Sequence, residues 1–142
     1  MALTHMKTNI IKRLGYAGLI PFVASAAGHL SGLPTAQIGV LYGAIILSFL
    51  GGIQWGTGLR GHLDDSDPTY RIVVSVVPSI IAFAAVLMAP PYSVVLLLGG
   101  FVGQWRYDRA HSDTVNWPAW FLDLRTHLSI GALVCLGLLL VP

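Results

Sequence analysis

The chain has 142 residues, of which 55% are hydrophobic and only 10% are charged, and its mean hydropathy is +0.74. An ordinary soluble domain is roughly 25% charged, so this composition excludes a soluble globular protein and predicts a membrane protein. The single cysteine, Cys135, excludes an internal disulfide and a cysteine-based metal cage. No polar stretch is long enough to form a separate soluble domain. We therefore expect one transmembrane domain over residues 1–142.

Five apolar runs approach or reach the length needed to cross about 30 Å of hydrocarbon. The helices that contain them are expected at about residues 14–30, 36–60, 68–89, 92–109 and 119–141. The first run also has the features of a signal peptide, with basic residues before it and Ala24-Ser25-Ala26 near its end. A counterpart later in the chain favours a transmembrane helix instead. The prediction is an all-α integral membrane protein with five transmembrane helices.

Charged residues fall on one side of these runs. The basic residues are Lys7, Lys12, Arg13, Arg60, Arg71, Arg106, Arg109 and Arg125. The acidic residues are Asp64, Asp65, Asp67, Asp108, Asp113 and Asp123. Each of these precedes the first run, lies in the connections between the second and third or the fourth and fifth helices, or lies in the helix ends that border those connections. By the positive-inside rule, the N-terminus is expected inside and the C-terminus outside.

A weak parallel repeat relates the first two expected helices to the next two. Gln54-Trp55 and Gln104-Trp105 lie 50 residues apart, each near the inner end of a helix that runs inward. Pro21 and Pro78 similarly lie mid-span in the two helices that run outward. Two proline-bent helices paired with two glycine-rich helices, plus a fifth helix, form the expected bundle.

Small residues recur at helical spacing in the glycine-rich helices. Close backbone approach and interhelical hydrogen bonds drive helix association in lipid, so we expect helix contacts at these positions. The stripes are Gly39 and Gly43; Ser48, Gly52 and Gly56; and Gly99 and Gly103. Gln54 and Gln104 are expected to hydrogen-bond to a neighbouring helix, with substrate contact as the alternative.

Three stretches carry a resemblance to a known family: "LGYAGLIPFVASA", "LYGAIILSFLGGIQWG" and "FLDLRTHLSIGALV". Over residues 14–140 the chain resembles a family of small bacterial and mitochondrial membrane proteins, a domain of unknown function that includes the animal transmembrane protein 69. The resemblance implies a multi-helix protein of the bacterial inner membrane, or of the mitochondrial inner membrane if the source is eukaryotic. It implies no catalytic residue and no ligand.

Candidate sites for chemistry lie near the inner membrane surface. Arginines suited to an anion or a lipid headgroup are Arg60, Arg71, Arg106, Arg109 and Arg125. A loop that could hold a cation contains His62, Asp64, Asp65 and Asp67. Its spacing does not match an EF-hand, so a solvated, helix-capping loop is the favoured interpretation. The histidines are not placed to be two axial ligands of one haem. We therefore predict no catalytic residue, metal or cofactor.

One polar pair stands at the start of the fifth helix. Asp123 and His127 are four residues apart and share a face, where an ionised carboxylate would favour a protonated imidazole. Arg125 points to nearly the opposite side of the helix, toward lipid phosphate or a loop. The pair is therefore predicted to face the bundle.

Three functions fit these features. The favoured one is an accessory or assembly component that binds other membrane subunits or itself. The alternatives are a channel or carrier for a small neutral solute and an interfacial enzyme acting on an anionic lipid. The expected partners are the bilayer and membrane proteins, and no nucleic acid is expected.

Overall fold

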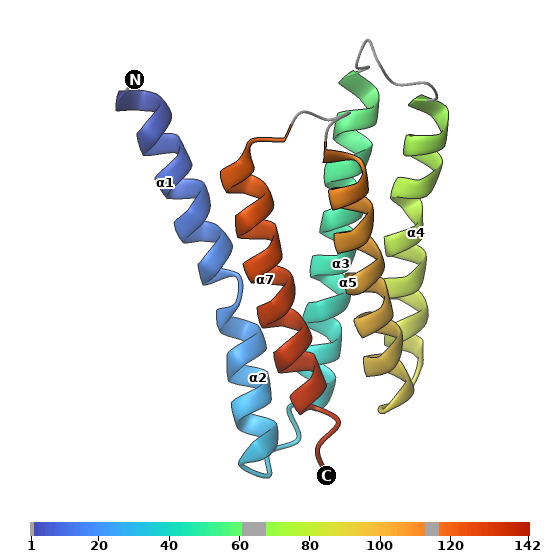
Figure 1. Ribbon diagram of the computed structural model, residues 1–142. Helices are drawn as coiled ribbons and strands as arrows, with labels where there is room; N and C mark the ends of the chain where they lie inside the picture. Colours follow the sequence, from blue (N-terminus) through green and yellow to red (C-terminus); the bar gives the residue numbers. More distant parts are fainter. Residues whose placement is uncertain (1, 61–67, 113–116) are drawn as a thin grey trace.

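The structure is a computed structural model that describes residues 2–60, 68–112 and 117–142. Within these ranges the chain forms α-helices and no strand (Figure 1), which confirms the all-α prediction for the described part of the chain. The helices are α1 (Ala2–Ala17), α2 (Ile20–Leu30), α3 (Ala36–Arg60), α4 (Pro68–Leu87), α5 (Tyr92–Ala110) and α7 (Ala119–Leu138).

The first apolar run forms two helices rather than one bent helix. The helical region begins at Ala2, well before the expected start near residue 14, and is interrupted at Gly18 and Leu19. Pro21 lies in the first turn of α2. A proline lacks the N–H that an interior helical position needs, but the first turn does not use that donor. The change of direction therefore precedes Pro21.

Four segments of the described chain are long and apolar enough to cross a membrane. They are Met6–Leu30, Ala36–Leu59, Thr69–Leu87 and Ala119–Leu138. Helix α5 is not among them, because its last five residues include Arg106, Asp108 and Arg109. Membrane-spanning helices are thus confirmed, while a fifth crossing by α5 stays a prediction.

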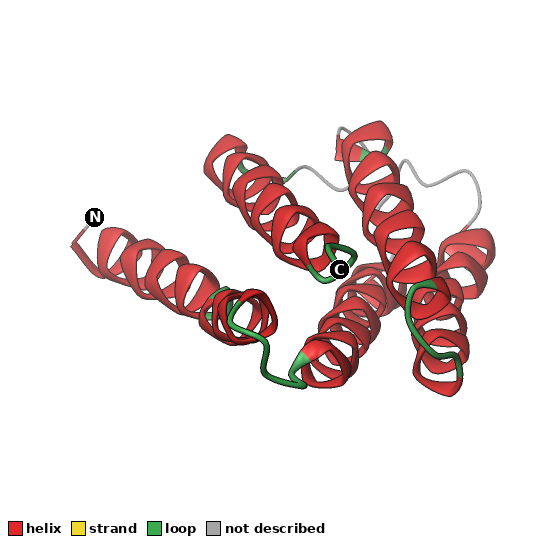
Figure 2. Cartoon of the chain, turned by 90° about the horizontal axis from the view of Figure 1, so that it is seen from below, coloured by secondary structure: helices red, strands yellow, loops and turns green. Residues whose placement is uncertain are grey.

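Helix α3 is the centre of the bundle, with contacts to α2, α4, α5 and α7. Helix α7 lies between the α1–α2 limb and α5 (Figures 1 and 2), and the main contacts of α1 are with α7. The apolar core fills the space between these helices. Its fully buried members include Val40, Leu47, Val94, Leu97 and Leu136.

Glycines mark the closest approaches between helices. A methyl group on Gly51 of α3 would lie 2.5 Å from the backbone carbonyl oxygen of Ser75 in α4. One on Gly100 of α5 would lie 2.5 Å from the Leu47 side chain. Real side-chain carbons do not approach so closely, so α3 and α4 can pack at this distance only because Gly51 lacks a side chain, and a side chain at Gly100 would require Leu47 to shift.

The predicted glycine stripes are partly wrong. Gly39 of α3 does lie against α2 and against Leu139, which follows α7, and Gly43 lies against α5, α7 and α2. However, a methyl group on each of four other glycines would meet nothing within 4 Å in the described part of the chain. These four are Gly52, Gly56, Gly99 and Gly103. Spacing shows which residues share a stripe, but the lipid-facing side of a membrane helix is as apolar as its core-facing side, so spacing does not reveal which stripe faces inward.

Reciprocal hydrogen bonds fasten the turn between α2 and α3. The Ser25 hydroxyl donates to the Thr35 carbonyl at 2.8 Å, and the Thr35 hydroxyl donates to the Ser25 carbonyl at 2.7 Å. Gly32, between them, has a φ of 81°, a left-handed conformation that glycine adopts without steric cost. The limb formed by α1 and α2 is thereby anchored to α3 at one end.

Candidate functional site

A buried carboxylate lies in the last turns of α5. Asp108 is only 5% exposed, and Gln104, one helical turn earlier, donates its side-chain amide to Asp108 Oδ1 at 2.9 Å. Gln54 of α3 donates its amide to the same oxygen. Residues four apart share a helix face, which is why Gln104 reaches Asp108. The two glutamines of the repeat therefore meet at one carboxylate.

Arg125 of α7 completes this arrangement. It is 7% exposed; its Nε donates to Asp108 Oδ2 at 3.0 Å, and its Nη2 donates to the same oxygen in a salt bridge. We call Gln54, Gln104, Asp108 and Arg125 the polar cluster. It joins α3, α5 and α7.

The hydrogen bonds of the polar cluster favour a structural role over a catalytic one. Both oxygens of Asp108 accept hydrogen bonds, so neither is free to take a proton from a substrate. Burying an ion pair costs desolvation energy, which the attraction and the added hydrogen bonds offset only when the geometry is good. Removing one partner of such a pair typically costs about 3–5 kcal/mol, because the other charge remains buried. The chemistry of the polar cluster thus favours a structural lock.

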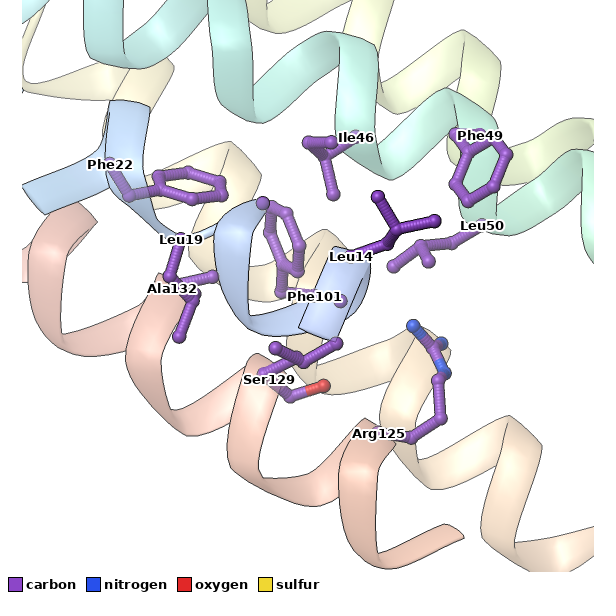
Figure 3. A pocket seen from close by; sticks show the side chains of 13 residues that line it. Leu14, Leu19, Phe22, Ile46, Phe49, Leu50, Phe101, Arg125, Ser129 and Ala132 are labelled. Atoms are coloured by element: carbon purple, nitrogen blue, oxygen red, sulfur yellow. The ribbon is translucent and has the colours of Figure 1, made fainter. Parts of the chain in front are cut away.

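An apolar pocket of about 160 Å³ borders the polar cluster. It lies between the α1–α2 limb, α3, α5 and α7, and Arg125 and Ser129 supply its polar groups (Figure 3). Its other lining residues are Leu14, Gly15, Gly18, Leu19, Phe22, Ile46, Phe49, Leu50, Phe101, Leu128 and Ala132.

The predicted Asp123–His127 pair is wrong. Both side chains are exposed, and within the described ranges no hydrogen bond or ion pair joins them. Instead, His127 Nδ1 lies 3.1 Å from the Tyr16 hydroxyl of α1, and the two rings stack at 6.5 Å. The orientation predicted for Arg125 is also wrong, because the side chain points into the bundle to Asp108 and not toward lipid phosphate.

Some of the arginines predicted to contact lipid headgroups are buried and others are exposed. Arg71 is 2% exposed and Arg125 is buried in the polar cluster, so these two are not available at the surface. Arg106 and Arg109 are exposed, and Arg109 Nη1 donates to the Thr126 hydroxyl of α7 at 3.2 Å. The side chain of Arg60 lies outside the described part of the chain.

The loop considered as a cation site also lies outside the part of the chain that the structure describes. That loop contains His62, Asp64, Asp65 and Asp67. Elsewhere, in residues 2–60, 68–112 and 117–142, no group of three or more histidine, cysteine or acidic side chains is placed to hold a metal ion.

Two signals in the sequence pointed toward the polar cluster. One is the repeated Gln-Trp pair at Gln54 and Gln104. The other is the four-residue spacing between Gln104 and Asp108, which places an amide and a carboxylate on one face of the same helix. A carboxylate in that setting needs a cation, but the sequence offers several arginines and does not say which one.

Comparisons with known proteins agree with a membrane location. A family model described as a protein of unknown function, DUF3429, matches residues 8–141. The transmembrane protein 69 of Xenopus tropicalis is 35% identical over 129 residues, which cover 87% of this chain and 50% of that protein. The chain thus spans about half the length of this relative. No solved structure matches it. With nearly its whole length matched, the chain belongs to the DUF3429 family of membrane proteins of unknown function.

Proposed function

We propose that this protein is an accessory or assembly component that binds other membrane-protein subunits through two open glycine faces. The first face is the stripe of Gly52 and Gly56 on α3, and the second is the stripe of Gly99 and Gly103 on α5. The observation that carries the proposal is that a methyl group on any of these four glycines would meet no described residue within 4 Å. Small residues exposed at helical spacing allow a second transmembrane helix to approach closely.

The surroundings of the second face suit a helix as partner. Gly99 and Gly103 line a groove of about 220 Å³ between α4 and α5, together with Pro78 and Val77. A groove with glycines along its floor lets a partner backbone come close enough for extensive van der Waals contact. That contact replaces the hydrophobic drive, which lipid does not supply between helices.

The polar cluster supports this function over the enzyme and carrier alternatives. Asp108 is the buried carboxylate of the bundle described here, and its donors already engage both of its oxygens. The cluster joins α3, α5 and α7, whereas alternating access needs one group of helices to move against another. A locked bundle suits a component that presents fixed surfaces.

We also propose five crossings, with the N-terminus inside a bacterial inner membrane, or a mitochondrial one if the source is eukaryotic. The N-terminus and the C-terminus lie at opposite ends of the bundle (Figure 1), as an odd number of crossings requires. Arg106 and Arg109 lie at the end that holds the N-terminus, in agreement with the positive-inside rule. Asp108 is paired with Arg125, which lowers the cost of placing the end of α5 in lipid.

Purification from native membranes in a mild detergent tests the proposal. We expect the wild-type chain to carry another membrane protein in fixed stoichiometry, identified by mass spectrometry. Gly56→Leu and Gly103→Leu should lose this protein while keeping the helical content and thermal stability of the wild type. Val95→Leu, at an exposed position of α5, is the matched control and should retain it. A wild-type chain that purifies without another protein contradicts the proposal.

A further inference from the structure

Two polar side chains of α7 line the apolar pocket, and each offers it an atom that makes no hydrogen bond to a described residue. Arg125 uses Nε and Nη2 for Asp108, and its Nη1 has no hydrogen bond to a described residue. Ser129 is 4% exposed, and its hydroxyl likewise bonds to nothing in the described ranges. The two residues are one helical turn apart on the same face of α7, and both line the pocket (Figure 3).

The pocket continues into a longer groove. A second hollow of about 340 Å³ shares Leu14, Leu50 and Arg125 with the first and is otherwise apolar. At its rim, Leu14 of α1 is 68% exposed and Phe49 of α3 is 63% exposed. The groove therefore opens sideways between α1 and α3, toward the surface that faces lipid in a membrane.

The charge of Arg125 restricts what can occupy this groove. Asp108 already neutralises the guanidinium, so an anionic ligand would bring an uncompensated charge into a surrounding of low polarity. An uncharged oxygen acceptor can take hydrogen bonds from Nη1 and from the Ser129 hydroxyl without that cost. Apolar walls with a few convergent polar groups are the usual construction of a small-molecule site.

We propose that this groove binds a lipid-soluble molecule with an uncharged carbonyl group. The carbonyl oxygen accepts from Arg125 and Ser129, and the hydrocarbon part lies along Leu14, Phe49 and Leu50 toward the bilayer. A quinone ring and the ester group of a neutral glycerolipid both present this chemistry. Such a ligand binds on the α1 side of the bundle and does not depend on the glycine faces.

Binding of added compounds to the purified protein distinguishes a quinone from a neutral glycerolipid as the ligand. Native mass spectrometry from detergent counts the molecules bound when decylubiquinone, dioctanoylglycerol or laurate is added at equal concentrations. We expect one equivalent of a neutral carbonyl compound: a preference for decylubiquinone assigns a quinone, and a preference for dioctanoylglycerol assigns a lipid ester. Laurate carries a carboxylate in place of the uncharged carbonyl and should bind at least about tenfold more weakly, because its charge is uncompensated.

Variants of Ser129 test the location. Ser129→Ala removes one hydrogen bond and should weaken binding by about threefold to tenfold. Ser129→Leu fills the pocket and should abolish binding; if it does not fold, Ser129→Ala alone decides. Ser93→Ala, at a fully buried serine of α5 outside the groove, is the control and should bind as the wild type does. Equal binding of laurate and the neutral probes, no binding of either neutral probe, or unchanged binding by Ser129→Ala would overturn the proposal.

Discussion

At Asp108, donors from α3, α5 and α7 converge on one carboxylate. The local sequence favours a different pair, because Asp123 and His127 share a helix and a face. Local spacing reports neighbours on one helix, whereas Asp108 and Arg125 are 17 residues apart and meet only when two helices pack. Gln54 was predictable as an interhelical donor, whereas Gln104 donates within its own helix and not to a neighbour, and the acceptor that the two share was not predictable.

The first prediction concerns the charge of Asp108. Asp108→Asn leaves the Arg125 guanidinium buried without a countercharge, so we expect the free energy of unfolding to fall by about 3–5 kcal/mol. Thermal or denaturant unfolding in detergent measures this loss. The double variant Asp108→Leu with Arg125→Met removes both charges and should recover much of it.

Asp123→Asn is the matched control for that experiment. Asp123 is exposed near the start of α7, so its substitution should change stability by less than about 0.5 kcal/mol. If Asp108→Asn and Asp123→Asn behaved alike, the polar cluster would not hold the bundle together.

A second prediction follows from the position of His127. Its contact with the Tyr16 hydroxyl is exposed, and exposed contacts of this kind contribute little to stability. We therefore expect His127→Gln to match the wild type in thermal stability and in its co-purifying partner. Loss of the partner protein in this variant would contradict the prediction and show that His127 is needed for partner binding.

At the scale of the helices, two adjacent glycines provide a sharp comparison. A methyl group at Gly51 would lie 2.5 Å from the Ser75 carbonyl oxygen, whereas one at Gly52 would meet no described residue within 4 Å. We expect Gly51→Ala to lower the free energy of unfolding by about 1–3 kcal/mol, because α3 and α4 must move apart. Gly52→Ala should leave stability unchanged or slightly raised, since alanine favours a helix by up to about 1 kcal/mol.

Unfolding of both variants in the same detergent measures the difference. If Gly51→Ala and Gly52→Ala were equally stable, Gly51 would not set the distance between α3 and α4. Gly100→Ala repeats the test on α5, where a methyl group would lie 2.5 Å from Leu47.

The elements themselves were largely predictable from composition and length. Apolar runs bounded by charged residues indicate transmembrane helices because the hydrocarbon layer sets their length. The break at Gly18 and Leu19 was not predictable, because the proline pattern places the bend at Pro21. The face of α3 that packs against the bundle was not predictable either. Gly51 and Gly52 are the same residue type at adjacent positions, and only the direction in which each points distinguishes the packed face from the open face.

At the scale of the whole molecule, the five-crossing topology can be tested by thiol labelling. In a Cys135→Ser background, cysteines at Ser31 and Tyr92 should react with an impermeant reagent added outside, and one at Thr69 only with reagent admitted inside. All three positions are exposed. Ser93 is unsuitable because its side chain is fully buried. Labelling of Thr69 from outside, or of Tyr92 from inside, would contradict five crossings with the N-terminus inside.

The central claim is that the open glycine faces contact other membrane helices, and photocrosslinking in native membranes tests it most directly. A photoreactive amino acid replaces Val102, beside Gly103 on α5, or Trp55, beside Gly56 on α3; both positions are exposed. We expect a discrete crosslinked protein from these positions and none from Val23, an exposed position on α2. Absence of a crosslinked protein at Val102 and Trp55, or the same products at Val23, would contradict the claim.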